Sequence, residues 1–126
     1  MSGELEEKLK ELKTEDFIWL IYIGIIFLSW YSNYLERNYF LYNDLISKDK
    51  YRKTLILIFS ILLVVYLYFL KDAIDSINKL KPTDSKKKKD LAYLSFIGSL
   101  LITISGVIFL YIAVVDDNID VELAFN

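Results

Sequence analysis

Three stretches of this chain are long, apolar and free of charged side chains, and they decide what the chain can fold into. They comprise residues 17–34, 54–70 and 91–115, which are 18, 17 and 25 residues long. A helix needs about 20 apolar residues, within a range of about 17–25, to cross the hydrocarbon core of a bilayer. Each stretch therefore has the length and composition of a membrane-spanning helix.

A soluble helical bundle is the alternative explanation for apolar helices in a chain of 126 residues. Its helices would carry charged side chains at every third or fourth position, on the face turned toward water. The three stretches carry none. We therefore predict an all-α fold in which residues 17–115 form a three-helix transmembrane bundle.

The segment ahead of the first apolar stretch, residues 1–16, is predicted to be an amphipathic N-terminal helix. Leu5, Leu9 and Leu12 recur at helical spacing and form one stripe among Glu and Lys residues. Thr14 is a candidate N-cap for the first spanning helix, which would begin near Asp16. The regular sequence of residues 1–13 fits both a native segment and an appended leader.

Helix-breaking and helix-capping residues predict where the connections between the spans lie. The first helix meets no breaker before residues 43–49, so we expect a turn near residues 47–49 and a second helix from about Lys50. The second helix should continue past Leu70 and stop before Pro82, the only proline. Asp84 or Ser85 is expected to cap the third helix. Residues 116–126 are expected to form an acidic C-terminal tail.

Orientation follows from the basic residues outside the spans, which favour the cytoplasmic side. The leader holds three and the second connection seven, and three crossings place these two segments on one side. The first connection holds five and the tail none. Ten against five predicts a cytoplasmic N-terminus and a C-terminus outside.

Small residues within the spans mark places where helices can approach closely. Helices in lipid associate through close backbone packing and interhelical hydrogen bonds, and small side chains allow both. The predicted helix-packing or oligomer face comprises Ser95, Gly98, Ser99, Thr103, Gly106, Gly24 and Ser60. It serves either packing inside the bundle or a seam between copies, and the Ser/Thr face of the third helix is also a candidate pore lining.

Four consecutive lysines precede the third span. Near an anionic membrane surface each Lys contributes about 1 kcal/mol to binding. We expect Lys86, Lys87, Lys88 and Lys89 to contact lipid headgroups and to help fix the orientation.

The composition excludes several kinds of chemistry. With no Cys and no His, the chain has no disulfide and no His-based acid–base catalysis, and it lacks the usual zinc ligands. Four carboxylates after the third span could serve as calcium ligands: Asp116, Asp117, Asp120 and Glu122. They lack the glycine and the ligand spacing of an EF-hand, which favours a solvated tail. We expect no enzyme activity, no catalytic residues, no cofactor, no metal and no nucleic-acid partner.

Three stretches carry a resemblance: YRKTLILIFSILLVVYLYFLKD, LSFIGSLLITISGVIFLYIA and VDDNIDVELAFN. They are similar to short membrane proteins of low-GC, clostridia-like Gram-positive bacteria, a family with no assigned activity or catalytic residues. The resemblance implies a location in a bacterial plasma membrane.

These observations predict a small non-enzymatic membrane protein that acts through helix–helix association as an interaction or accessory subunit. Its expected partners are membrane lipids and either a second copy or another membrane protein. The alternative is a small oligomeric channel or transport component lined by the Ser/Thr face of the third helix.

Overall fold

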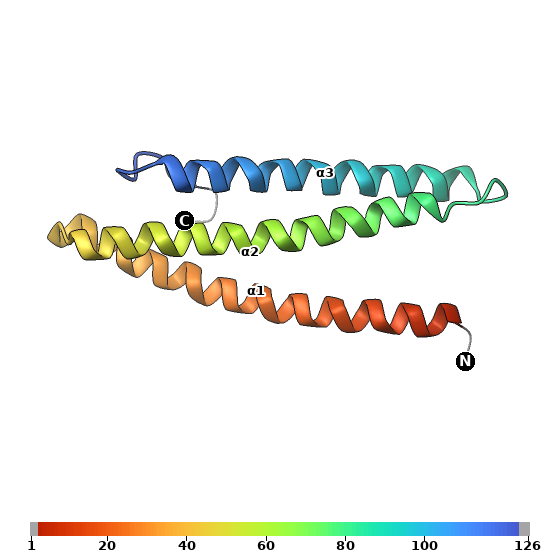
Figure 1. Cartoon of the computed structure of the whole chain (residues 1–126), viewed down its shortest axis with the longest axis horizontal. Coiled ribbons are helices and arrows are strands. Elements are labelled where there is room, and N and C mark those ends of the chain that lie inside the picture. The colour runs from red at the N-terminus through yellow and green to blue at the C-terminus, as the bar shows by residue number, and fades with distance from the viewer. Residues whose placement is uncertain (1–2, 124–126) are drawn as a thin grey trace. The chain divides into compact units, whose positions relative to one another are not determined.

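The computed structural model describes residues 3–123 and is built from three long helices (Figure 1). They are α1 (Gly3–Tyr42), α2 (Leu45–Asn78) and α3 (Lys86–Val115). No strand occurs among the described residues. All three helices are long and apolar enough to cross a membrane. The predicted all-α fold with three potential membrane-spanning helices is thus confirmed.

Each helix is longer than its apolar stretch. With 40, 34 and 30 residues, the helices measure about 60, 51 and 45 Å at about 1.5 Å per residue. A bilayer's hydrocarbon core is about 30 Å thick. An upright helix of any of these lengths that crosses a bilayer would therefore extend beyond the hydrocarbon core on at least one side.

The N-terminal amphipathic segment is helical, as expected, but it is the first part of α1 rather than a separate helix. Thr14 does not cap a helix; its hydroxyl donates to the carbonyl of Lys10 at 3.1 Å, inside the helix. The prediction of a helix start near Asp16 was wrong. The physical reason is the lack of any Gly or Pro between Gly3 and Gly24, in a stretch that begins with strong helix formers.

The turn between α1 and α2 lies at Asn43 and Asp44, four residues earlier than predicted. Asn43 adopts a left-handed conformation (φ 50°), which Asn tolerates at the end of a helix. The Asp44 carboxylate accepts from the Ile46 and Ser47 backbone N–H groups at 3.1 and 3.4 Å, and from the Ser47 hydroxyl at 2.8 Å. These hydrogen bonds, first of all the one from the Ser47 side chain, lower the pKa of Asp44. This capping explains why α2 begins before Lys50.

The second connection follows the prediction. The α2 helix ends at Asn78, ahead of Pro82, and Ser85 is the N-cap of α3. The Ser85 hydroxyl oxygen accepts the Lys88 backbone N–H at 3.1 Å, which satisfies one of the free donors at the helix start.

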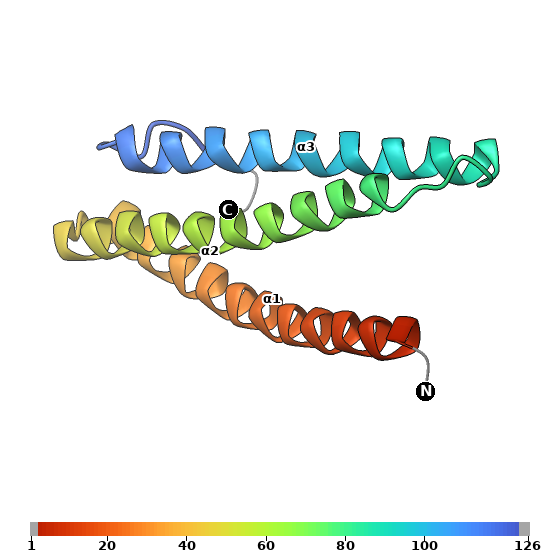
Figure 2. The ribbon, with the colours of Figure 1, turned by 45° about the vertical axis from the view of Figure 1, so that its right-hand side comes forward.

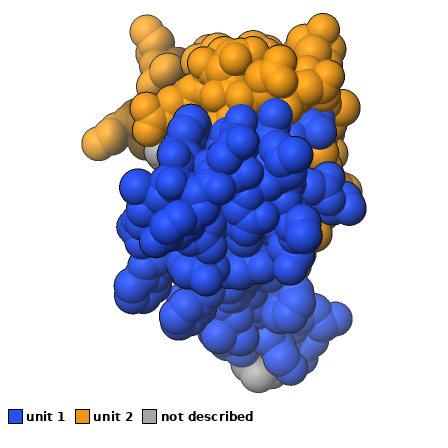
Figure 3. Space-filling model, turned by 90° about the vertical axis from the view of Figure 1, so that its left-hand side faces the viewer, with its two compact units in different colours: residues 1–54, 125–126 blue, residues 55–124 orange. Residues whose placement is uncertain are grey.

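The described chain falls into two compact units that meet within the sequence of α2 (Figure 3). Unit 1 holds α1 and α2 up to Thr54. Its buried residues near the turn come from both helices: Ser32, Leu35, Ser47, Tyr51 and Thr54.

Unit 2 begins at Leu55 and holds the rest of α2, α3 and the following tail. Its two helices run antiparallel and side by side, as Figures 1 and 2 both show. Its buried helical residues are Leu55, Ile58, Phe59, Leu62, Val65, Ala73, Thr103, Gly106 and Ala113.

The tail after α3 has a defined turn as far as Leu123. The two carboxylate oxygens of Asp116 accept the backbone N–H groups of Asp120 and Val121 at 3.0 and 2.9 Å. These bonds, led by the one from Asp120, lower the pKa of Asp116. Leu123 is buried. An acidic side chain at a helix C-terminus opposes the helix dipole, and here the carboxylate is stabilised by backbone donors of the tail instead.

Candidate functional site

The side of α3 turned toward α2 carries mostly small residues at alternating spacings of three and four. Seven buried or half-buried positions follow this spacing: Ala92, Phe96, Ser99, Thr103, Gly106, Leu110 and Ala113. This repeat of about 3.5 residues is typical of helices that cross at a shallow, left-handed angle. We call these seven positions the α2–α3 seam.

Gly106 is the closest approach within the seam. A Cβ atom at this position would lie 3.0 and 3.3 Å from two ring carbons of Tyr66, and 3.6 Å from a methyl of Leu63. No larger side chain fits there unless the Tyr66 ring moves. Glycine therefore allows α3 to lie directly against the aromatic ring of α2.

Thr103 adds a polar contact between the two helices. Its hydroxyl donates to the Ser99 carbonyl of its own helix at 2.7 Å and lies 3.4 Å from the Tyr66 carbonyl of α2. The shorter bond satisfies the buried hydroxyl, and the longer contact is a weak bridge at the edge of hydrogen-bonding distance. Toward the C-terminus of α3, the rings of Phe59 and Phe109 continue the seam, with centroids 5.7 Å apart.

Other small residues of α3 lie on a different face. Ser95, Gly98 and Ser105 are exposed, and a Cβ at Gly98 would meet no atom within 4 Å among the described residues. The Ser105 hydroxyl donates back to the Leu101 carbonyl at 3.0 Å. We call Ser95, Gly98 and Ser105 the open face of α3. The predicted packing residues are thus divided between two faces, because Ser95 lies outside the seam that contains Ser99 and Thr103.

The small residues predicted in the other helices differ in the same way. In α1, Gly24 is exposed and a Cβ there would meet nothing within 4 Å. In α2, Ser60 is half-buried. The predicted packing face omits Ser32, which is fully buried and whose hydroxyl donates to the Ser29 carbonyl at 2.7 Å. Its burial could have been anticipated from the spacing of Ile18, Ile25, Ser32 and Leu35 along one side of α1.

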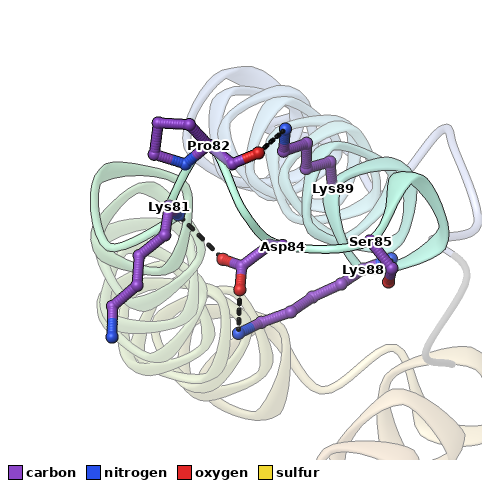
Figure 4. A network of polar contacts seen from close by, with 6 residues as sticks. All are labelled: Lys81, Pro82, Asp84, Ser85, Lys88 and Lys89. Atoms are coloured by element: carbon purple, nitrogen blue, oxygen red, sulfur yellow. Dashed lines mark hydrogen bonds and ion pairs between the residues drawn. The ribbon is translucent and has the colours of Figure 1, made fainter.

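The lysine run opens α3 and takes part in a network around Asp84 (Figure 4). The Asp84 carboxylate accepts the Lys81 backbone N–H at 2.7 Å and pairs with the Lys88 ammonium at 3.3 Å. The Lys89 ammonium donates to the Pro82 carbonyl at 3.2 Å. The hydrogen bond from Lys81 is the main reason why the pKa of Asp84 is lowered.

The four lysines therefore differ in their surroundings. The ammonium groups of Lys88 and Lys89 are engaged by the turn, whereas Lys86 and Lys87 have exposed side chains at the helix start. Lys86 and Lys87 are the two best placed to reach anionic groups outside the protein. Among residues 3–123, no group of three or more acidic side chains is arranged to hold a metal ion.

Comparison of the chain with protein-family models, curated proteins and solved structures gave no match in any of the three. The functional argument therefore depends on the geometry of the helices and turns described above.

Proposed function

We propose that this multi-pass membrane protein is a non-enzymatic interaction or accessory subunit that acts through association of its helices with those of a second copy or another membrane protein. The observation that carries the proposal is the open face of α3. In membrane helices, small residues are enriched where another helix packs closely, because they let the two backbones approach. Gly98 and Ser95 have no such neighbour within unit 2.

The seam supplies the internal comparison for this proposal. Gly106 and Thr103 show what small residues of α3 do when a helix covers them: the glycine admits a ring, and the threonine approaches a carbonyl. The open face offers the same two chemical groups, a glycine and hydroxyl side chains. A second helix can use them in the same way.

The setting we propose is a bacterial plasma membrane, with the N-terminus in the cytoplasm and the C-terminus outside. The resemblance of residues 51–72 and 94–113 to clostridia-like membrane proteins supports the membrane type. The ten-to-five distribution of basic residues supports the orientation. Lys86 and Lys87 would then face anionic headgroups of the cytoplasmic leaflet.

Cross-linking tests the association directly, because the natural chain has no cysteine. Gly98→Cys in native membranes should give a disulfide-linked dimer on mild oxidation. Ile104→Cys is the matched control, since Ile104 is exposed on another side of the same helix. Equal cross-linking at both positions, or none at Gly98 in membranes and after purification, would contradict a self-association seam. Disulfide capture of a different membrane protein by the thiol of the Gly98→Cys variant would identify the accessory role.

The channel alternative is tested by flux. A pore lined by hydroxyls would have to use Ser95 and Ser105, because Thr103 is buried in the seam. Purified protein in liposomes should show no more ion or solute leak than empty liposomes under our proposal. Leak that rises with protein density and disappears with Ser105→Leu would replace the accessory role with a transport role.

A further inference from the structure

Basic side chains gather on both sides of the turn between α1 and α2. They are Arg37, Lys48, Lys50, Arg52 and Lys53. The first apolar stretch ends at residue 34 and the second begins at residue 54, so each basic residue lies within about 9 Å of helix from one of them. The headgroup layer on one side of a bilayer is about 5–8 Å thick. In upright helices, these side chains would therefore lie at the headgroup level of the bilayer that the chain itself crosses.

The acidic side chains of the same region are fewer: Glu36, Asp44 and Asp49. Two of the three are engaged within the chain. The Asp44 carboxylate caps the start of α2, and the Asp49 carboxylate pairs with the Lys53 ammonium at 2.9 Å. Arg37 and Lys50, in contrast, are exposed. The excess of two positive charges, five against three, is therefore presented to the surroundings of the hairpin.

Arg37 lies on an exposed side of α1 that is otherwise apolar. Separations of four, three and four residues place one series on the same side of the helix: Trp30, Tyr34, Arg37 and Leu41. Its aromatic and apolar members are 71%, 53% and 65% exposed. Trp30 belongs to the first apolar stretch, and Arg37 follows it by seven residues, or about 10 Å. We call these four residues the α1 track.

The start of α2 shows the same order in reverse. Separations of four, three and four residues again define one side of the helix: Ile46, Lys50, Lys53 and Leu57. Both lysines are exposed, and the two apolar residues are 70% and 49% exposed. Leu57 belongs to the second apolar stretch, and Lys50 precedes it by seven residues. We call these four residues the α2 track.

The order within each track matches the layers of a bilayer surface. Lys and Arg lay their apolar stems along neighbouring apolar side chains and keep the charged group at the polar surface. Acyl chains would cover the inner members of both tracks, and phosphate groups would meet Arg37 and Lys50. Exposed apolar side chains combined with positive charge hold helical segments at anionic interfaces. The two tracks provide this combination.

The sign of the charge selects the class of lipid. Each Lys or Arg near a bilayer surface favours anionic over zwitterionic headgroups. The opposite end of α1 has the opposite character, because Glu15 and Asp16 directly precede the first apolar stretch. One helix thus contains a basic end and an acidic end, and lipid preference can be compared between them.

We propose that the α1–α2 hairpin binds anionic phospholipids of the bilayer that the chain itself crosses. Arg37 and Lys50 contact the phosphate groups, and the apolar members of the two tracks lie along the acyl chains. This surface is separate from the lysines at the start of α3. The inference rests on the membrane setting of the proposed function and is independent of association through the open face of α3.

The two tryptophans test the α1 track, since Trp30 belongs to it and Trp19 lies near the acidic end of the same helix. The full chain is placed in nanodiscs, one chain per disc, as Trp19→Phe or as Trp30→Phe. The discs contain phosphatidylcholine and phosphatidylglycerol in a fixed ratio, and either lipid carries bromine on its acyl chains, which quenches a neighbouring tryptophan. The preference for phosphatidylglycerol should be about threefold or more at Trp30 and close to one at Trp19.

Variants of Arg37 separate charge from fold. Arg37→Gln should lower the preference at Trp30 toward one, because the positive charge above it is removed. Arg37→Lys retains the charge and should retain the preference. Lys86→Gln is the matched control, since it removes an exposed positive charge from the start of α3 and should leave Trp30 unaffected. High salt should weaken the preference by screening.

The α2 track is tested in the same way. Leu57→Trp, in a chain whose two natural tryptophans are replaced by Phe, places a reporter seven residues from Lys50. This reporter should also prefer phosphatidylglycerol, and Lys50→Gln should lower its preference toward one.

Four results would overturn the proposal. Two of them are equal preferences at Trp30 and Trp19, and a preference at Trp30 that Arg37→Gln leaves unchanged. Loss of the preference on addition of glycerol phosphate would assign the surface to a soluble phosphate compound. Quenching at Trp30 that disappears with two chains per disc would assign it to a second copy. Quenching by brominated phosphatidylcholine at both tryptophans tests the membrane setting separately, so a missing lipid preference would leave that setting intact.

Discussion

The two faces of α3 carry the same types of residue and have different surroundings. In the seam, a Cβ atom added at Gly106 would lie 3.0 Å from the Tyr66 ring, and Thr103 is buried. On the open face, Gly98 would meet nothing within 4 Å and Ser105 bonds only to its own helix among the described contacts. Small residues in an apolar helix therefore indicate where another helix could approach closely. Only the contacts of each residue show whether a helix does so.

The largest expected effect distinguishes the two glycines. Gly106→Leu should destabilise the folded protein by about 1–3 kcal/mol, because the added side chain collides with the Tyr66 ring. Gly98→Leu makes the same chemical change where there is space and should leave the stability of the monomer unchanged or slightly raised. Unfolding in a mild detergent under monomeric conditions measures both. Equal losses would show that the open face is covered in the monomer as well.

Association should respond in the opposite order. Gly98→Leu should reduce the pairing of labelled copies in bicelles by several-fold, because a leucine keeps a second helix at a distance. Ser99→Leu, inside the seam, should act on the fold and not specifically on pairing. Energy transfer measured against the protein-to-lipid ratio gives the pairing constant. A Gly98 variant that pairs as well as the natural chain would refute the open face as an association surface.

A smaller difference is expected between two hydroxyls. Thr103→Val keeps the shape of the side chain and removes its contacts with the Ser99 and Tyr66 carbonyls. The cost should be about 0.6 kcal/mol, the average for hydrogen bonds between membrane helices. Ser105→Ala should cost close to nothing, since its bond lies on the open face. The detergent unfolding measurement applies here too, and a larger loss at Ser105 would reverse the assignment of the faces.

The smallest expected effect is that of low pH on stability. Acid should weaken the turn between α2 and α3 without affecting the seam or the open face of α3. Folding lowers the pKa of Asp84, so its contribution to stability is complete above the unfolded value of about 3.9 and is lost as the pH falls through the folded value. Tm should therefore decline slightly below about pH 4, in part through this turn. Asp84→Asn should reduce that decline, and Gly98→Leu should not alter it. An unchanged acid response in the Asn variant would remove Asp84 as a contributor.

The sequence predicted the parts of the fold that depend on composition and on local caps. Uncharged runs identified the three helices, and Pro82 and Ser85 located the second connection. The first turn was placed at residues 47–49 because Asn43 and Asp44 were read as the start of a loose breaker region. In the structure Asn43 supplies the left-handed residue and Asp44 the cap, so two residues complete the turn. The dipeptide Asn43–Asp44 is visible in the sequence, and it locates the turn more precisely than the extent of the polar region does.

The division of the small residues between two faces was not predictable in the same way. Ser95, Ser99 and Thr103 are spaced four residues apart. Helices that pack with a repeat of about 3.5 residues do not keep such residues on one side, so the three cannot all lie at the same interface. The register of the two helices decides which of these residues contact α2. That register is fixed by long-range contacts such as Phe59 with Phe109 and Tyr66 with Gly106. A single sequence does not contain the pairing of these residues.

The α1 helix is continuous from Gly3 to Tyr42, so its two ends are mechanically coupled. A helix of 40 residues without a proline has no hinge of the usual kind, so a force that turns or tilts its first turns is transmitted along about 60 Å of backbone. Its first residues and Tyr42 lie at opposite ends of that rod, with the apolar stretch between them. A tilt imposed on residues 3–16 would thus reach Tyr42 as the movement of one continuous helix.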